Sequence, residues 1–299
     1  MRARAPGKVV LSGAYAVLYG APAVVSAVSR YAIANAARPA DFVTPEVRSA
    51  LGEAPAPWFD ASALRGARGK LGLGSSAAIL VACLAAQALA ARSPGDDESL
   101  ARAVLERALA AHRSAQGGGS GVDVATSVWG RTLIARRSGD ALATERVALP
   151  TGLVWEVWAG GAPASTAAFV GRVAELARRE AKLFAGLMDP LCEQAEAAAN
   201  AFRVGNEREL LARLRAQRAG LEALGRAAEI PIVTPEVAEL AELAEQDGAV
   251  VLPSGAGGGD VEIYAGTAPP SSALAARRAA LGHERLELEL DARGVHALD

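Results

Sequence analysis

The sequence is poor in cysteine, in long hydrophobic runs and in any excess of charge of one sign. Its 299 residues include only two cysteines, Cys83 and Cys192, too few for a disulfide framework or a cysteine-based zinc site. The longest uninterrupted apolar stretch, Ala77–Ala86, falls well short of the roughly 20 residues that span a bilayer. A formal net charge of -2 lacks the basic excess of a general nucleic-acid binder. We therefore expect a cytoplasmic protein that binds neither membranes nor nucleic acids.

Lysine is also scarce, although basic residues are not. Lysine and arginine together number 31, yet only three are lysines: Lys8, Lys70 and Lys182. A compact, flexible ammonium group does chemistry that the planar guanidinium group cannot imitate. Because Lys8 and Lys70 both lie beside glycines in short motifs, we interpret them as candidate functional cations.

The hydrophobic pattern predicts strands and helices in both halves of the chain. Strands are expected at 9–13, 14–18, 132–137, 153–160, 249–252, 260–266 and 286–291, with 23–28 either a strand or the start of a buried helix. Helices are expected at 75–92, 97–116, 165–187, 190–204, 207–228, 234–246 and 271–281. Long helices dominate after Pro163, so the chain is divided into domains at 1–155 and 156–299.

The strongest motif is the glycine-rich segment 69–78, GKLGLGSSAA, which runs directly into the apolar helix. Glycines let backbone N–H groups approach a ligand, and a helix N-terminus attracts anions. Ser75 and Ser76 add hydroxyl groups that suit phosphate or Mg²⁺. The spacing matches neither a Walker A loop nor a Rossmann fingerprint, so the motif indicates either an anion cradle or simply a capped helix after a loop.

Three further segments carry candidate chemistry, and each has an ordinary structural alternative. In QGGGSGVDVA, Asp123 is either a general base or metal ligand or merely the cap of a turn or helix. The loop PSGAGGGD at 253–260 is either a hairpin turn or a close backbone approach to a ligand. In APGK, Lys8 either offsets charge on a transferred phosphoryl group or is an ordinary surface lysine. Together these features form the set that phosphoryl transfer needs.

In this order the motifs resemble the GHMP kinase superfamily over essentially the whole chain. APGKVVLSGAYAVLYG is similar to its first motif, GLGSSAA to its second and PSGAGGGD to its third. The resemblance implies an α+β fold of two domains, the first like ribosomal protein S5 domain 2 and the second ferredoxin-like, with ATP and substrate in the cleft between them. Within the superfamily, AHRSAQGGGSGVDVATSVWG and WAGGAPAST resemble the phosphomevalonate kinases.

The resemblance also implies roles for individual residues. Lys8 and Asp123 would be catalytic, and Ser76 would help to hold Mg²⁺ that accompanies ATP. The ATP site would comprise Lys70, Gly72, Leu73, Gly74, Ser75, Ser76 and Ala77. The acceptor, a small phosphorylated or hydroxyl acid, would contact Lys8, Tyr15, Ser120, Gly121, Ser165, Ser254 and Gly255.

Two positions bear on which acceptor is used. Mevalonate kinases usually have a metal-binding glutamate eleven residues before the aspartate, whereas this chain has His112, which favours the phosphomevalonate interpretation. The first motif usually contains an acidic residue where this chain has Ala14. Mevalonate kinase or another small-alcohol kinase is therefore the alternative, and a non-catalytic binding protein or a scaffold are weaker ones. The long C-terminal helices could form a homodimer or bury their own faces.

Overall fold

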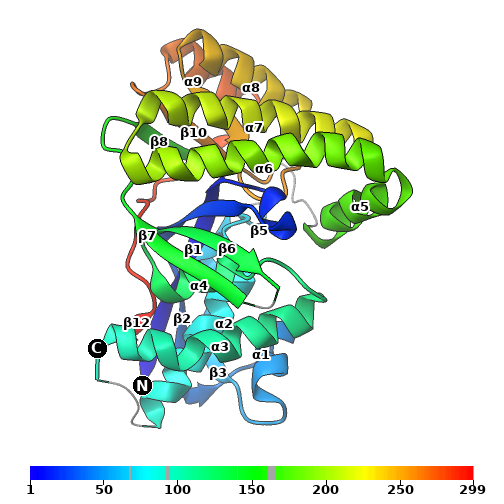
Figure 1. Cartoon of the computed structure of the whole chain (residues 1–299). Helices are drawn as coiled ribbons and strands as arrows, with labels where there is room; N and C mark the ends of the chain where they lie inside the picture. The colour runs from blue at the N-terminus through cyan, green and yellow to red at the C-terminus, as the bar shows by residue number, and fades with distance from the viewer. Residues whose placement is uncertain (67–68, 92–94, 140, 161–165, 299) are drawn as a thin grey trace.

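A computed structural model describes residues 1–298 apart from 67–68, 92–94, 140 and 161–165. The described strands form two larger antiparallel sheets and a small hairpin (Figure 1). The first sheet has the order β12-β1-β2-β6-β7, with β3 paired to β2. Its strands are β1 (Arg2–Ser12), β2 (Pro22–Pro39), β3 (Pro57–Asp60), β6 (Thr132–Ser138), β7 (Ala141–Val147) and β12 (His296–Leu298).

The second sheet has the order β11-β8-β10-β9 and lies in the other half of the molecule. Its strands are β8 (Val154–Ala159), β9 (Val250–Pro253), β10 (Val261–Gly266) and β11 (Glu284–Arg285). The hairpin of β4 (Arg65–Gly66) and β5 (Gly69–Lys70) precedes the helix of the strongest glycine motif. The α+β fold class is confirmed, and the domain division at residue 155 stays a prediction.

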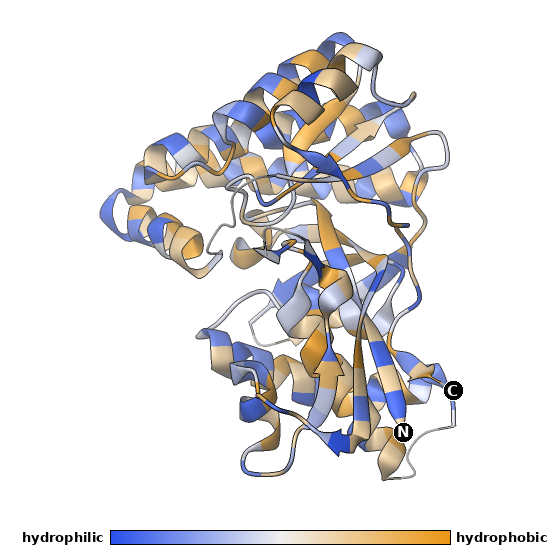
Figure 2. Ribbon diagram, turned by 180° about the vertical axis from the view of Figure 1, so that it is seen from behind, coloured by the Kyte–Doolittle hydropathy of each residue, from blue (hydrophilic) through white to orange (hydrophobic). Residues whose placement is uncertain are grey.

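Helices cover both sheets. The first sheet carries α1 (Pro45–Leu51), α2 (Ser75–Ala90), α3 (Asp97–Gln116) and α4 (Val122–Trp129), with short 3-10 turns η1 (Ala16–Tyr19) and η2 (Ser62–Leu64). The other half carries α5 (Thr166–Arg179), α6 (Ala181–Val204), α7 (Glu207–Ala228), α8 (Pro235–Gln246) and α9 (Ser272–Ala280). The long helices alternate between hydrophilic and hydrophobic residues along their length (Figure 2), as helices with one buried face do.

Helix α2 lies in the centre of the first half and has no polar face. Every residue from Ala77 to Ala86 is buried, which explains its continuous apolar sequence. The same hydrophobic cluster continues into the second sheet through Leu252 and Ile263 and reaches Leu210 on α7. The two halves therefore share one apolar core, which fixes the loops at their junction relative to one another.

Three local predictions were wrong. Residues 14–18 were expected to be a strand, but they lead into the 3-10 turn η1, with Tyr15 at a left-handed φ of 60°. The helix expected at 165–187 ends at Arg179, and the break expected before Pro190 does not occur, because α6 runs from Ala181 to Val204. Pro190 lies inside α6 on an exposed face, where water can bond the carbonyl group that loses its donor.

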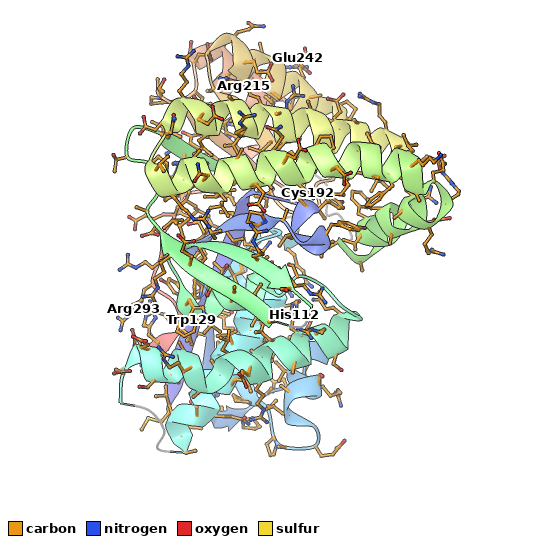
Figure 3. All side chains as sticks on the ribbon, in the orientation of Figure 1. His112, Trp129, Cys192, Arg215, Glu242 and Arg293 are labelled. Carbon is orange, nitrogen blue, oxygen red and sulfur yellow. The ribbon has the colours of Figure 1, made fainter. Side chains whose placement is uncertain are left out.

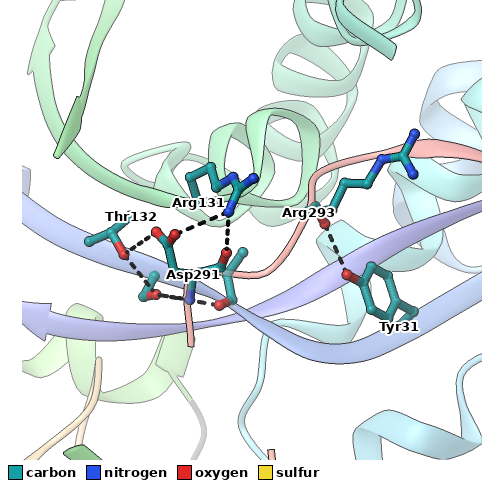
Figure 4. Close-up of polar contacts among 7 residues, drawn as sticks. Tyr31, Arg131, Thr132, Asp291 and Arg293 are labelled. Atoms are coloured by element: carbon teal, nitrogen blue, oxygen red, sulfur yellow. Dashed lines mark hydrogen bonds and ion pairs between the residues drawn. The ribbon is translucent and has the colours of Figure 1, made fainter. Parts of the chain in front are cut away.

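The third wrong prediction was a regular final strand at 286–291. Instead the chain passes between the two sheets, donating from Leu286 N–H to the Val157 carbonyl and bridging Val28 at Leu290. Asp291 fastens this segment to the first sheet, because its Oδ1 accepts from the Thr132 hydroxyl at 2.9 Å (Figure 4). The last strand thus pairs with the first strand of the protein.

Candidate active site

Lys8 lies on β1, deeply buried for a lysine, with 7% of its surface exposed. Its backbone N–H donates to the Leu73 carbonyl at 2.9 Å, which joins β1 to the glycine motif. A Cβ atom on Gly7 would lie 2.7 Å from that same carbonyl oxygen, so glycine is required for this approach. The Lys8 Nζ atom lies 3.4 Å from Oδ1 of Asp123. The alternative of an ordinary surface lysine is therefore wrong.

The strongest glycine motif delivers the N-terminus of α2 to this ion pair. Gly74 occupies the N-cap position with a left-handed φ of 71°, and no side chain caps the helix. A Cβ on Gly74 would lie 3.1 Å from Cε of Lys8 and 3.6 Å from Oδ2 of Asp123. Uncapped N–H groups, the positive helix end and an ammonium group thus lie side by side, as an anion site needs. Ser75 and Ser76 form the partly exposed first turn.

Asp123 belongs to the first turn of α4. The N-cap of that helix is Gly121, at a φ of 78°, and no side chain caps it, so Asp123 is not a helix cap. About a third of its side chain is exposed (32%), which leaves the carboxylate accessible beside Lys8. The Ser120 hydroxyl accepts from the Val122 N–H at 3.4 Å and helps to fold the loop before the helix.

The third glycine loop, residues 254–260, is bonded directly to the first motif. The Val10 N–H donates to the Ser254 hydroxyl at 2.8 Å, and the Tyr15 hydroxyl donates to the Ala256 carbonyl at 2.8 Å. A Cβ on Gly255 would lie 3.9 Å from the Lys8 Nζ atom. The loop connects β9 to β10, but its role is larger than that of a hairpin turn, because it faces the same ammonium group as α2 does.

Asp260 ends this loop and was not among the predicted site residues. A Cβ on Gly72 would lie 2.4 Å from its Oδ2, so the second and third glycine loops touch through this carboxyl group. Burial, together with the negative charge of Glu262, raises the pKa of Asp260 to about 6, although Lys8 acts in the opposite direction. Its place at the end of the glycine run was the only signal in the sequence that could have identified it.

Glu262, two residues after the end of the loop, belongs to a second buried pair. Glu262 is fully buried on β10, and its Oε2 lies 3.0 Å from Nδ1 of His283. Burial raises the pKa of Glu262, while the hydrogen bond and charge of His283 oppose the rise. These two residues are 21 positions apart, and no sequence pattern joins them.

Gln217 is another residue near the site that sequence reasoning missed. It lies on α7, is 3% exposed, and its Oε1 accepts from the Gly13 N–H at 2.8 Å and from the Ser12 hydroxyl at 3.1 Å. The side chain therefore holds the turn of the first motif beside Ala14, where the superfamily usually has an acidic residue. A glutamine within an amphipathic helix gives no sequence signal of this contact.

Glu46 on α1 lies beside Ser76 in the first turn of α2. Its pKa would be raised by burial, but hydrogen bonds from its own backbone N–H and from the Gln116, Thr44 and Ser76 side chains outweigh burial and lower it below the usual value. Gln116 donates to its Oε1 at 3.2 Å. His112, one turn earlier on α3 than Gln116, is also buried (Figure 3).

The remaining predicted residues divide into three groups. Leu73 and Ala77 are each 1% exposed and pack their side chains in the core, so only their backbone could face a ligand. Lys70 is exposed on β5, opposite Arg65 in the hairpin. Ser165 lies outside the described residues.

The described residues contain no group of three or more histidine, cysteine, aspartate or glutamate side chains that could hold a metal ion by themselves. Magnesium usually takes one or two protein ligands and draws the others from phosphate and water. The Ser76 hydroxyl beside the Glu46 carboxylate suits such an ion, because Oε2 of Glu46 is buried without a hydrogen-bond partner. Among the described helices, none is both long and apolar enough to pass through a bilayer.

Comparisons with known proteins identify relatives of this chain. Residues 64–131 match the family model of the GHMP kinases N terminal domain. A phosphomevalonate kinase from Streptomyces sp. is 32% identical over 216 residues, which are 65% of this chain and 56% of that enzyme. A mevalonate kinase from Archaeoglobus fulgidus is 30% identical over 280 residues, 87% of this chain and 90% of that one. The match thus spans little more than half of the Streptomyces enzyme.

The solved structure of Streptococcus pneumoniae phosphomevalonate kinase with phosphomevalonate and AMPPNP has the same fold. Its TM-score is 0.76 at 19% identity, and the alignment covers 97% of this chain and 99% of that one. The family match and the relatives named as kinases define the class as that of the phosphotransferases. The chain belongs to the GHMP kinase family, and its relatives include kinases of the mevalonate pathway.

Proposed function

We propose that the protein transfers the γ-phosphoryl group of ATP to the phosphate of (R)-5-phosphomevalonate, giving 5-diphosphomevalonate and ADP. The observation that carries the proposal is the convergence of three separate segments on the Lys8 ammonium group. Asp123 lies 3.4 Å from it, and both the N-terminus of α2 at Gly74 and the third glycine loop at Gly255 adjoin it. The match to the Streptomyces phosphomevalonate kinase supports this acceptor.

The residues of this chain divide the work between nucleotide and acceptor. The N–H groups of the first turn of α2, with Ser75 and Ser76, bind the ATP phosphates at the positive helix end. Magnesium, when bound with ATP, would be held by Ser76 and would neutralise charge on the phosphate oxygens. The third loop, which adjoins Lys8 at Gly255, contacts the acceptor through Ser254 and Gly255.

The transfer step places little demand on a base. A nonbridging oxygen of the acceptor phosphate forms a bond to the γ-phosphorus, and the bond from that phosphorus to the β,γ-bridging oxygen breaks. ADP leaves with the electron pair. Lys8 stabilises the charge shared by the two reacting groups, and Asp123 orients the ammonium group and the incoming oxygen. Tyr15, Ser120 and Gly121 complete the acceptor contacts that we propose.

Mevalonate kinase activity is the second candidate, and the Archaeoglobus relative favours it because the match covers most of both chains. A hydroxyl acceptor would need Asp123 to take its proton, whereas a phosphate acceptor is already ionised at neutral pH. A screen of mevalonate, phosphomevalonate and other small alcohols with ATP, following ADP release, separates the two candidates. Phosphomevalonate should give the highest kcat/KM, and a preference for mevalonate would refute the proposed acceptor.

Variants of the two central residues test the site itself. Lys8→Met and Asp123→Ala should each lower kcat at least ~100-fold, because each removes a charged group that contacts the reacting oxygens. Lys182→Met, a change of a lysine on the exposed start of α6, is the matched control and should keep normal turnover. Near-normal kcat in purified Asp123→Ala would contradict its role. Calorimetry that finds no saturable ATP binding by the unaltered protein would contradict the kinase function altogether.

A further inference from the structure

Glu46 is a buried acidic residue beside Ser76 that takes no part in the transfer step proposed above. It lies in the first turn of α1, with only 6% of its surface exposed, where α1 packs against α2 and α3. The cap of α1 is Thr44, whose hydroxyl accepts from the Val47 N–H at 3.3 Å. Glu46 is therefore not needed as the N-cap of its own helix.

The two oxygens of the Glu46 carboxylate have different surroundings. Its Oε1 accepts from Nε2 of Gln116 at 3.2 Å, while Oε2 is buried with no hydrogen-bond partner in the part of the chain that the structure describes. No basic side chain among the described residues forms an ion pair with it. The nearby polar group from α2 is the hydroxyl of Ser76, which contributes a hydrogen bond to the carboxylate.

Hydrogen bonds lower the pKa of Glu46 and so keep it ionised, and its buried Oε2, which has no hydrogen-bond partner, is a ready ligand for a cation. The position of Glu46 says where that cation would lie. Ser76 is in the first turn of α2, two residues from Gly74, whose surroundings are the Lys8 ammonium and the Asp123 carboxylate. The carboxylate, on α1, thus lies beside the first turn of α2, where the triphosphate is proposed to bind.

We propose that Glu46 and the Ser76 hydroxyl together bind the divalent cation that enters with the nucleotide. Two oxygen ligands from the protein, with phosphate and water oxygens supplying the rest, is the arrangement that Mg²⁺ favours. Gln116 holds the carboxylate in place by its bond to Oε1, leaving Oε2 for the ion. The inference rests on the proposed function, because the remaining ligands come from ATP.

The test measures metal affinity rather than turnover. Mn²⁺ replaces Mg²⁺, and electron paramagnetic resonance follows free Mn²⁺ in mixtures with AMPPNP and the full-length protein. Glu46→Gln keeps the shape and the contact to Gln116 but removes the charge, and it should weaken Mn²⁺ binding in the ternary complex at least ~10-fold. Glu53→Gln, at an exposed position after α1, is the matched control and should bind Mn²⁺ normally.

Two further measurements separate a metal ligand from a structural residue. In EDTA, Glu46→Gln should bind AMPPNP as tightly as the unaltered protein or more tightly, because a negative charge near the triphosphate is gone. Its Tm in EDTA should be unchanged or slightly lower, because the hydrogen bonds that lower the pKa of the carboxyl group stabilise its charge in the folded protein. Ser76→Ala should weaken Mn²⁺ binding too, and the double variant should lose less than the sum of the two single losses.

Some results would overturn the inference while leaving the kinase proposal intact. Unchanged Mn²⁺ affinity in Glu46→Gln, or an equal loss of AMPPNP affinity with and without metal, would show that Glu46 does not bind the cation. Failure of the unaltered protein to bind AMPPNP under any condition would instead refute the nucleotide site, and with it both proposals.

Discussion

Asp260→Asn should change the pH dependence of stability, because Asp260 holds a proton in the folded protein that the unfolded chain releases. Burial beside Glu262 raises the pKa of Asp260 to about 6 from a usual value of 3.8. Between about pH 4 and pH 6 the folded state therefore binds more protons than the unfolded state. The contribution of this group is fully present below about pH 4 and is lost as pH rises through about 6. Asparagine cannot titrate, so the variant should not show this loss.

The size of the effect follows from the shift. A pKa difference of about two units corresponds to roughly 3 kcal/mol at most, and partial exposure of the side chain to solvent reduces this to roughly 1–3 kcal/mol. Other carboxyl groups titrate in the same range, so the informative quantity is the difference between unaltered protein and variant at each pH. That difference should grow in favour of Asp260→Asn from pH 4 to pH 7.

Urea unfolding at pH 4, 5, 6 and 7, followed by circular dichroism, measures the free energy of unfolding at each pH. Asp247→Asn, at an exposed position just after α8, is the matched control and should run parallel to the unaltered protein. If the free energy of unfolding of Asp260→Asn varied with pH in parallel with that of the unaltered protein, the pKa of Asp260 would not be raised by folding. The reasoning from its burial beside Glu262 would then be refuted.

The same contacts give further predictions. Gln217→Ala should lower the free energy of unfolding by about 1–3 kcal/mol, because the buried Gly13 N–H loses its acceptor. Urea unfolding measures this loss, with the exposed Glu242→Gln as the control variant, and an unchanged urea midpoint in Gln217→Ala would contradict the prediction. Gly72→Ala places a Cβ 2.4 Å from Oδ2 of Asp260 at a left-handed φ of 66°. It should raise KM for ATP about 10-fold, with a smaller effect on Tm, and equal KM values would refute the close contact.

Much of the fold could be read from the sequence, because it depends on local periodicity. The amphipathic helix at 97–116 matches α3 residue for residue, and Thr234 with Pro235 marks the start of α8 as its N-cap and first residue. The glycine motifs also identified the family, because a left-handed φ such as that of Gly74 is a local requirement of the backbone.

Predictions failed where distant segments decide the local structure. Residues 286–291 alternate like a strand, yet they run between the two sheets because Leu286 bonds to β8 and Leu290 bridges β2. Residues 14–18 are apolar, but the contacts of Gly13 with Gln217 and of Tyr15 with the third glycine loop make them a turn.

The amino-acid sequence by itself determined most of the long helices and which glycine loops can approach a phosphate, because both are properties of a few consecutive residues. Only the tertiary structure decided that Lys8 and Asp123 form a pair and that Asp260 closes against Gly72. It also decided that the Glu46 carboxylate lies within hydrogen-bonding distance of the Ser76 side chain, which is 30 positions later in the chain. Burial and charge interaction depend on distance in space, and a core shared by both sheets sets those distances.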